Sequence, residues 1–275
     1  MPKKSLMRIA LATALPAITM SAALGAESET IHLYSAGSLR AALTDIAAAY
    51  SSTYHITVEP VYGASGALGD RLARGEAGDI FTSADMGYPE ALTQAGKSGP
   101  TVLFARNHLC AILRPGLHAT SNTILATLLK PAIKVGTSSP SNDPGGAYAW
   151  AMFKKAEDVR SGSRATLEGK ALKMGSEPGM LTVPPNTKNA MVWLLQTQHL
   201  DVFLSYCTNG HAAEADLPGL TTVSLPPELS VVANEGLTVL KGPNEENATQ
   251  FALFILSPAG QKILAEHGFD APLQP

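Results

Sequence analysis

The chain has 275 residues, of which 45% are apolar and 16% are charged, and its formal net charge is −3. This length is enough to bury a sizeable core in one large or two medium domains. The composition excludes a disordered, collagen-like or coiled-coil protein, and the acidic balance argues against a nucleic-acid-binding surface.

Residues 1–26 have the features of a secretory signal peptide. Three basic residues precede an apolar stretch from Ile9 to Met20, and small residues then supply a cleavage site. The alternative is a retained anchor helix, which the short apolar stretch and Pro16 disfavour. We therefore expect export to the periplasm. Cleavage would remove the three positive charges and lower the net charge from −3 to −6.

Strands and helices alternate along the first part of the chain. The pattern predicts strands at 31–36, 56–62 and 79–85, and helices at 38–50, 66–74 and 89–95. This order indicates an α/β fold with a mostly parallel sheet. Ligands of such sheets bind at the carboxyl ends of the strands, where the loops that contain Ser38, Ser65 and Ser83 would gather.

Two strand-to-helix junctions in this part share one design. Ser38 follows Gly37 and is expected to cap a helix, and Ser65 stands among glycines before the next helix. A helix start offers unpaired N–H groups and a positive dipole end, so the two junctions together predict a site for one small oxyanion. The alternative is a pair of ordinary strand-to-helix turns.

The second part of the chain repeats this design once. The long apolar run from Thr101 to Leu113 is expected to cross from one domain to another, and the polar loop 137–146 then precedes a helix at 147–156. That loop is alternatively only a Pro-Gly turn. A buried strand is predicted at 201–207, strands at 229–232 and 237–240 around the turn Asn234–Gly236, and helices at 248–256 and 258–267.

The two cysteines, Cys110 and Cys207, each lie in a strand-like run. An even number of cysteines in an exported protein favours one disulfide, and two buried free thiols are the alternative.

Other chemistry finds little support in the sequence. The seven histidines are scattered without metal-ligand spacing, and the glycines at 63, 66 and 69 lack the Lys-Ser/Thr of a P-loop. The segment Gly63–Ala67 is similar to a nucleophile elbow but ends in alanine. A secreted serine hydrolase that uses Ser65 therefore stays open as an alternative. It would need an acid and a histidine downstream, such as Asp216 and His267.

Six segments in order resemble the periplasmic molybdate-binding proteins of ABC importers, over residues Ile31 to Phe269. They are Ala36–Leu39, Gly63–Leu68, Gly78–Asp85, Ala105–Asn107, Asp143–Tyr148, and Leu256–Gln261 with Gly268–Phe269. The resemblance implies a two-lobed α/β fold of the type II periplasmic binding proteins. Two crossing strands would join the lobes. The long run Thr101–Leu113 and the C-terminal helices, which need the sheet of the first lobe, predict residues 27–105 and 226–275 in one lobe and 106–225 in the other, with the crossings near Arg106 and Pro226.

The resemblance also implies a set of ligand-binding residues. Ser38 and Ser65 would donate hydroxyl and backbone N–H groups from the first lobe. Gly145, with Gly146, would donate backbone N–H groups from the second lobe, and Tyr206 its phenolic O–H. Lys188 stands where the family provides a backbone donor, in a segment that departs from the usual sequence. Relatives with six-fold coordination have a carboxylate before the matching tyrosine, and Ser205 stands there, so simple tetrahedral recognition is expected.

The function that the resemblance implies is capture of molybdate, or of tungstate, and its delivery to an inner-membrane permease. Another small anion is the alternative. We expect a monomer without catalytic activity or cofactor, and a Cys110–Cys207 disulfide that joins two strands of the second lobe near the crossing. We also expect a site lined by donors only, which would disfavour protonated phosphate because its O–H would find no acceptor.

Overall fold

A computed structural model describes Met1 and residues 30–141, 143–175 and 179–272. Apart from Met1, the predicted signal peptide lies outside the described residues. The strands are β1 (Ile31–Ala36), β2 (Val58–Gly63), β3 (Ile80–Ser83), β4 (Val102–Leu113), β5 (Val135–Ser138), β6 (Leu172–Met174), β7 (Val202–Tyr206), β8 (Thr221–Ser224) and β9 (Val232–Val239). The helices are α1 (Arg40–Tyr54), α2 (Ser65–Ala73), α3 (Gly87–Gln94), α4 (Ile124–Leu128), α5 (Pro144–Val159), α6 (Ser163–Lys170), α7 (Ala190–Gln196), α8 (Cys207–Asp216), α9 (Glu245–Leu256) and α10 (Pro258–Glu266), with 3-10 turns η1 (Gly37–Leu39) and η2 (Pro227–Leu229).

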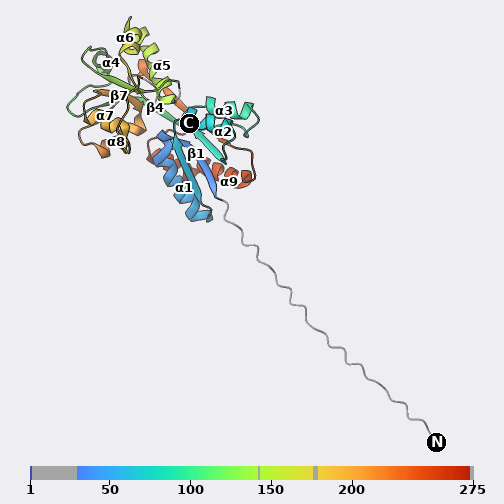
Figure 1. The fold of residues 1–275 in the computed structure, drawn as a ribbon. Helices are drawn as coiled ribbons and strands as arrows, with labels where there is room; N and C mark the ends of the chain where they lie inside the picture. Colours follow the sequence, from blue (N-terminus) through green and yellow to red (C-terminus); the bar gives the residue numbers. More distant parts are fainter. Residues whose placement is uncertain (2–29, 142, 176–178, 273–275) are drawn as a thin grey trace.

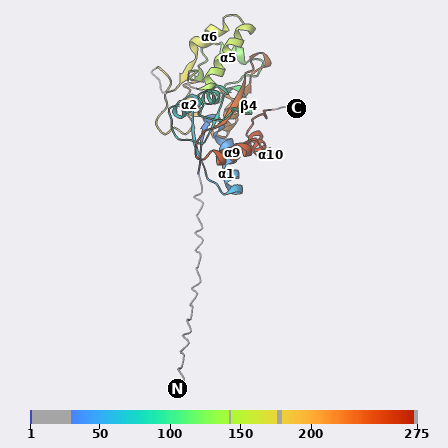
Figure 2. The same ribbon diagram turned by 90° about the vertical axis from the view of Figure 1, so that its right-hand side faces the viewer.

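The strands are joined in the order β2-β1-β3-β9-β4-β7-β5-β6, and β8 pairs with β4. Pairing is parallel around β1 and around β5, as alternating strands and helices predict. It is antiparallel where β9 and β4 meet in the middle of the order. Figure 1 shows the result as two bodies, one with α1, α2, α3 and α9 and the other with α4 to α8. The view in Figure 2 separates α5 and α6 from α9 and α10 in the same way.

Strand β4 belongs to both bodies. Its first part, Val102–His108, pairs with β9, and its second part, Leu109–Leu113, pairs with β7 and β8. Twelve residues of extended chain span about 40 Å, which is long enough to run from one body into the other. The long apolar run in the sequence is therefore one continuous strand.

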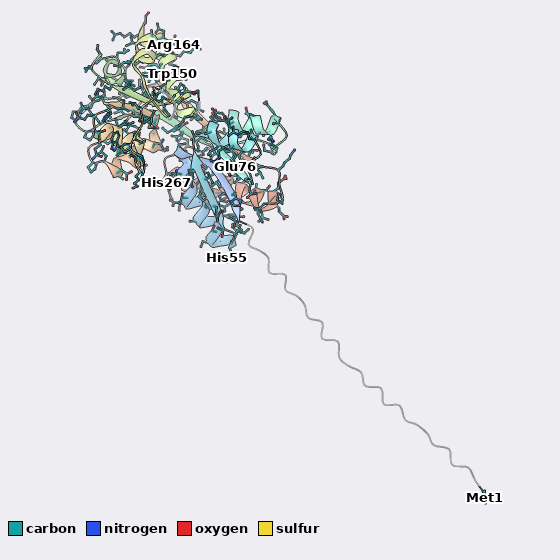
Figure 3. The ribbon with its side chains drawn as sticks, in the orientation of Figure 1. Met1, His55, Glu76, Trp150, Arg164 and His267 are labelled. Carbon is teal, nitrogen blue, oxygen red and sulfur yellow. A yellow bond between two sulfur atoms is a disulfide. The ribbon has the colours of Figure 1, made fainter. Side chains whose placement is uncertain are left out.

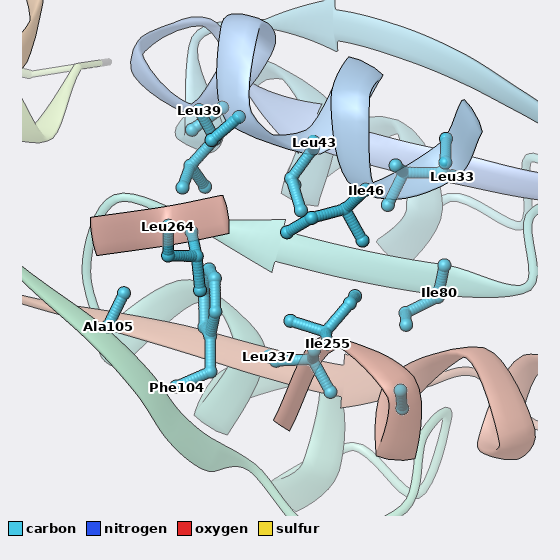
Figure 4. Packing of buried hydrophobic residues seen from close by; sticks show 14 of the residues in the cluster. Leu33, Leu39, Leu43, Ile46, Ile80, Phe104, Ala105, Leu237, Ile255 and Leu264 are labelled. Atoms are coloured by element: carbon cyan, nitrogen blue, oxygen red, sulfur yellow. The ribbon is translucent and has the colours of Figure 1, made fainter. Parts of the chain in front are cut away.

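The buried residues form a main core on either side of this crossing, and the first of them also includes Tyr206 of β7. One core lies between α1, α9 and α10 and the strands β1, β3, β4 and β9, and Figure 4 shows Leu43 and Ile46 of α1 facing Ile255 of α9. Two other cores are formed by buried residues between Leu109 and Val231, in the second body. The side chains of Trp150 and Arg164 lie in one body in Figure 3, and those of His55 and Glu76 in the other. The boundaries given above for the two lobes stay a prediction.

Two predictions near the crossing are wrong. The expected turn at Asn234–Gly236 is instead the middle of β9, because β3 and β4 supply backbone partners on both sides. Gly236 is required by close packing, since a Cβ there would lie 3.0 Å from the Asp85 carbonyl oxygen. The strand predicted at 201–207 ends at Tyr206, because Cys207 is the first residue of the helix α8, which the sequence pattern does not predict.

Candidate functional site

A cleft of about 1280 Å³ lies between the two bodies. Its walls come from the ends of β1, β2 and β3 on one side and from the ends of β5 and β7 on the other, with residues from the start of α7 and the end of α10. Ser38, Ser65, Lys188 and Tyr206 line this cleft together. Gly145 is not among the described residues that line it.

Ser38 lies in the short turn η1 and not at a helix cap. The residue that precedes η1 is Ala36, the residue that precedes α1 is Leu39, and neither has a side chain that caps the helix. The prediction of Ser38 as an N-cap is therefore wrong, because the 3-10 turn moves the start of α1 to Arg40. The consequence is that the Ser38 hydroxyl oxygen is buried without a hydrogen-bond partner.

Ser65 is the first residue of α2, and Ala64 occupies the N-cap position. The Ser65 side chain is buried, and its oxygen accepts a hydrogen bond from the Ala84 N–H at 3.1 Å. This leaves the hydroxyl proton available as a donor. The first N–H groups of an α-helix have no partner within the helix, so α2 adds backbone donors at the same place.

Tyr206 ends β7 and is only 3% exposed. Its phenolic oxygen has no hydrogen-bond partner, and its ring packs edge-on against Tyr148 with a centroid distance of 6.2 Å. Burial raises the pKa of Tyr206 well above its ordinary value, and the nearby carboxyl groups of Asp143 and Glu235 raise it further. The phenol therefore keeps its proton and acts as a donor.

Gly145 and Gly146 begin α5, but their N–H groups already have acceptors. The Gly145 N–H donates to Oδ1 of Asp143 at 2.8 Å, and the Gly146 N–H donates to the Asp143 carbonyl oxygen at 3.0 Å. Asp143 is the N-cap of this helix. The donors expected from this loop thus bind the loop's own aspartate, and the aspartate lines the cleft in their place.

Asp143 lines the cleft but is not among the ligand-binding residues that the sequence predicts. The order Asp-Pro-Gly-Gly is a typical start of a helix, and this was the available signal. Burial raises the pKa of Asp143, hydrogen bonds from the Gly145 N–H and the Ser138 hydroxyl lower it in part, and the charge of Asp85 raises it again. The expectation of a lining with donors only is therefore wrong, because a carboxylate accepts hydrogen bonds.

Lys188 lies on the rim of the cleft, in the segment before α7. Its side chain is 89% exposed, and its ammonium group lies 3.5 Å from Oδ1 of Asp216 at the end of α8. An exposed pair of this kind contributes little to stability. The positive charge is therefore present at the cleft but is not buried in it.

The predicted disulfide between Cys110 and Cys207 is present. Cys110 lies in β4 opposite Ser205 of β7, and Cys207 is the first residue of α8. The bond therefore joins a strand to a helix start and not two strands, because the chain leaves the sheet directly after Tyr206. It ties the residue next to Tyr206 to the crossing strand.

The residues required for a hydrolase do not come together at Ser65. The oxygen of Ser65 is bonded to the Ala84 N–H, and His267, which also lines the cleft, pairs with Asp45 at 2.8 Å. Asp216 pairs with Lys188. In the described part of the chain, no group of three or more His, Cys, Asp or Glu side chains could hold a metal ion.

Comparison with known proteins identifies the family of this chain. The model for the bacterial extracellular solute-binding proteins matches residues 31–270. The chain belongs to this family. An uncharacterized protein of Pasteurella multocida is 31% identical to this solute-binding protein over 241 residues, which cover 87% of the chain and 98% of the relative.

Two solved structures show the same fold as this solute-binding protein. The periplasmic molybdate-binding protein of Azotobacter vinelandii has a TM-score of 0.71 at 18% identity, with 88% of this chain and 100% of that chain covered. The sulfate-binding protein SubI of Mycobacterium tuberculosis has a TM-score of 0.72 at 20% identity, with 88% and 87% covered. The fold is that of the type II periplasmic binding proteins. None of the helices in the described residues is long and apolar enough to span a membrane.

Proposed function

We propose that this solute-binding protein captures a small tetrahedral oxyanion in the cleft and delivers it to an inner-membrane ABC permease. The observation that carries the proposal is a set of hydroxyl donors from both bodies. Ser38 and Ser65 come from one and Tyr206 from the other, and all three line one cleft. The oxygens of Ser38 and Tyr206 are buried without a partner.

Unpartnered buried hydroxyls are costly, since a polar group that loses water without gaining a hydrogen bond costs about 1–3 kcal/mol. An anion between the bodies would accept a hydrogen bond from each of the three hydroxyls and from the N–H groups that begin α2. Binding would then draw the two bodies together about β4, and the permease would recognise the closed form. The protein would act as a periplasmic monomer and catalyse no reaction.

Molybdate is the first ligand to test, with tungstate beside it. The sequence resemblance to molybdate-binding proteins and the fold shared with the Azotobacter vinelandii protein support this choice. The equally similar fold of a sulfate-binding protein makes sulfate the necessary comparison. Phosphate completes the panel because Asp143 supplies an acceptor for its proton.

Calorimetric titration with these four anions tests the proposal. We expect Ser38→Ala and Tyr206→Phe each to cost about 1–3 kcal/mol of affinity for the anion that binds. The chain offers matched controls, because Ser163 and Tyr50 also carry buried hydroxyls without partners and do not line the cleft. Ser163→Ala and Tyr50→Phe should leave affinity unchanged. If none of the four anions binds to the wild-type protein, the proposal is wrong.

A further inference from the structure

Asp143 carries an acceptor group into a cleft that otherwise presents hydroxyl donors. It lines the same cleft as Ser38, Ser65 and Tyr206, and its Oδ1 accepts the Gly145 N–H at 2.8 Å. An ionised carboxylate has about four lone-pair sites, and the Gly145 N–H and the Ser138 hydroxyl use two of them. Acceptor capacity therefore remains on the carboxylate for a group in the cleft.

The charges around Asp143 do not compensate a second anion beside it. Asp85, two residues after β3, is a carboxyl group whose charge acts on Asp143, and the buried Glu235 of β9 is a second carboxyl group that is ionised only above about pH 8. Tyr206 lines the cleft and Tyr148 packs against its ring, both as neutral phenols with raised pKa values. Burial raises the pKa of Tyr88 on α3, and the charges of Asp85, Asp70 and Asp143 raise it further.

The cationic side chains on the cleft wall have other partners. Lys188 is exposed and pairs with Asp216, and Arg40 lies over the ring of Tyr62 at 4.4 Å. His267 pairs with Asp45, and His211 lies 3.6 Å from Glu214. A fully ionised anion that entered the cleft would therefore meet an ionised carboxylate without a buried cation between them.

We propose that the bound oxyanion and Asp143 share one proton, so that the complex holds a single hydrogen bond from one partner's O–H to the other's oxygen. This inference rests on the proposed oxyanion-binding function. It makes Asp143 the residue that discriminates between anions by their protonation. Hydrogen phosphate, or the monoanion of a phosphate monoester, brings its own proton and donates it to the carboxylate. Molybdate and sulfate bring none, so they bind only as Asp143 takes a proton from water.

The shared proton can come from a protonated ligand or from water, and the environment of Asp143 is compatible with both sources. Burial raises the pKa of its carboxyl group, which eases protonation when a dianion enters. Proton uptake has a thermodynamic signature, because a ligand that binds with one proton loses affinity tenfold for each pH unit above the pKa of the group that takes it up.

The test is calorimetry of the full chain with molybdate, sulfate and inorganic phosphate, between about pH 6 and about pH 8.5, in two buffers of different ionisation enthalpy. We expect molybdate or sulfate to bind with uptake of about one proton and with affinity that falls toward tenfold per pH unit. Phosphate above about pH 7.5 should bind as the hydrogen-bearing dianion without net uptake.

Asp143→Asn is the decisive variant, because asparagine also caps helices and keeps an oxygen for the Gly145 N–H. It replaces the free acceptor by a donor. Phosphate affinity should fall at least tenfold, and the pH dependence of molybdate or sulfate binding should vanish. Glu266→Gln is the matched control, since Glu266 also lines the cleft but is exposed and lies 3.8 Å from Lys262. It should leave proton uptake unchanged.

The outcomes separate this inference from the proposed function. Tight binding of any of these anions without proton uptake, and with equal affinity in Asp143→Asn, would overturn the shared proton and leave the oxyanion site intact. If Glu266→Gln also abolished proton uptake, the uptake would depend on the overall negative potential of the cleft and not on Asp143. That result would also overturn the shared proton. Absence of binding by every anion would remove both proposals.

Discussion

The backbone N–H of Ala84 donates a hydrogen bond to the hydroxyl oxygen of Ser65 across 3.1 Å, and both residues are at most 2% exposed. This bond fixes the Ser65 oxygen as an acceptor and leaves its proton for a ligand. The Ser38 oxygen has no such bond. The two serines look equivalent in the sequence, yet only Ser65 also supports the fold.

Alanine substitution should separate these two roles. Ser65→Ala leaves the Ala84 N–H without its acceptor, so the free energy of unfolding without ligand should fall by about 1–3 kcal/mol. Ser38→Ala removes a buried hydroxyl that has no partner, so stability should not fall and should rise by up to about 1–3 kcal/mol. Urea unfolding of the unliganded variants measures both. Equal stability of the two variants would contradict the difference in roles.

Reduction of the Cys110–Cys207 disulfide should lower both stability and affinity. The bond closes a loop with a sequence separation of 97, for which loop entropy indicates about 2–5 kcal/mol of stabilisation. Affinity should fall because Cys207 follows Tyr206 directly. Unfolding with and without reductant gives the first effect and titration the second. The double variant Cys110→Ser, Cys207→Ser is the control, since reductant should not affect it. Two alkylated thiols in unreduced protein would contradict the disulfide.

Glu235 should make stability fall as the pH rises. Burial raises the pKa of this fully buried carboxyl group to about 8, although a hydrogen bond from Asn107 lowers it in part. Below the ordinary pKa of glutamate the group is protonated in both the folded and the unfolded state. Between that pKa and about 8 the unfolded state loses its proton while the folded state keeps it.

The expected loss of unfolding free energy is up to about 1.4 kcal/mol per pH unit across this window. In Glu235→Gln this part of the pH dependence should disappear, so the variant should gain most over wild type near pH 8. Thermal or urea unfolding from about pH 5 to about pH 9 tests this. Asp79→Asn, at a carboxyl group elsewhere in the fold, serves as a comparison. Parallel pH profiles of wild type and Glu235→Gln would rule out the buried neutral carboxyl.

Lys188 should affect how fast an anion arrives more than how long it stays. Its ammonium group is exposed on the rim and paired with Asp216, so it attracts anions through solvent. Lys188→Met should lower the association rate constant severalfold at low salt and leave the dissociation rate constant nearly unchanged. The difference should shrink as salt is added. Stopped-flow binding measures both rate constants, and a large rise in the dissociation rate would instead indicate direct contact with the bound anion.

The sequence predicted those parts of the fold in which local pattern and tertiary structure agree. The helices α9 and α10 and the long strand β4 follow their apolar patterns closely. The middle of β9 was misread because Asn234 and Gly236 are common turn residues, whereas neighbouring strands on both sides decide the conformation there. The start of α8 was missed because Thr208, Asn209 and Gly210 favour a loop.

The sequence predicted which segments line the cleft, but it did not predict the hydrogen bonds that their atoms form. The sequence pointed to the loops that carry Ser38, Ser65 and Tyr206, and the cleft contains all three. It did not reveal that the Gly145 N–H binds Asp143, because a helix start offers donors equally to a ligand and to its own cap. Only the three-dimensional arrangement shows which acceptor is nearer.

The point at which the pairing of β4 with β9 ends suggests how the second body could be removed from the chain. His108 lies opposite Val232 in the antiparallel register, and the next step is a hydrogen bond from the Leu109 N–H to the Val231 carbonyl oxygen at 3.1 Å. Residues 109–231 therefore leave the first body and return to it at adjacent positions, as an inserted domain does. A two-residue turn such as Asn-Gly could close β4 onto β9 as a hairpin. The remaining polypeptide would keep the core around α1, α9 and α10, apart from the contribution of Tyr206, in a shorter chain.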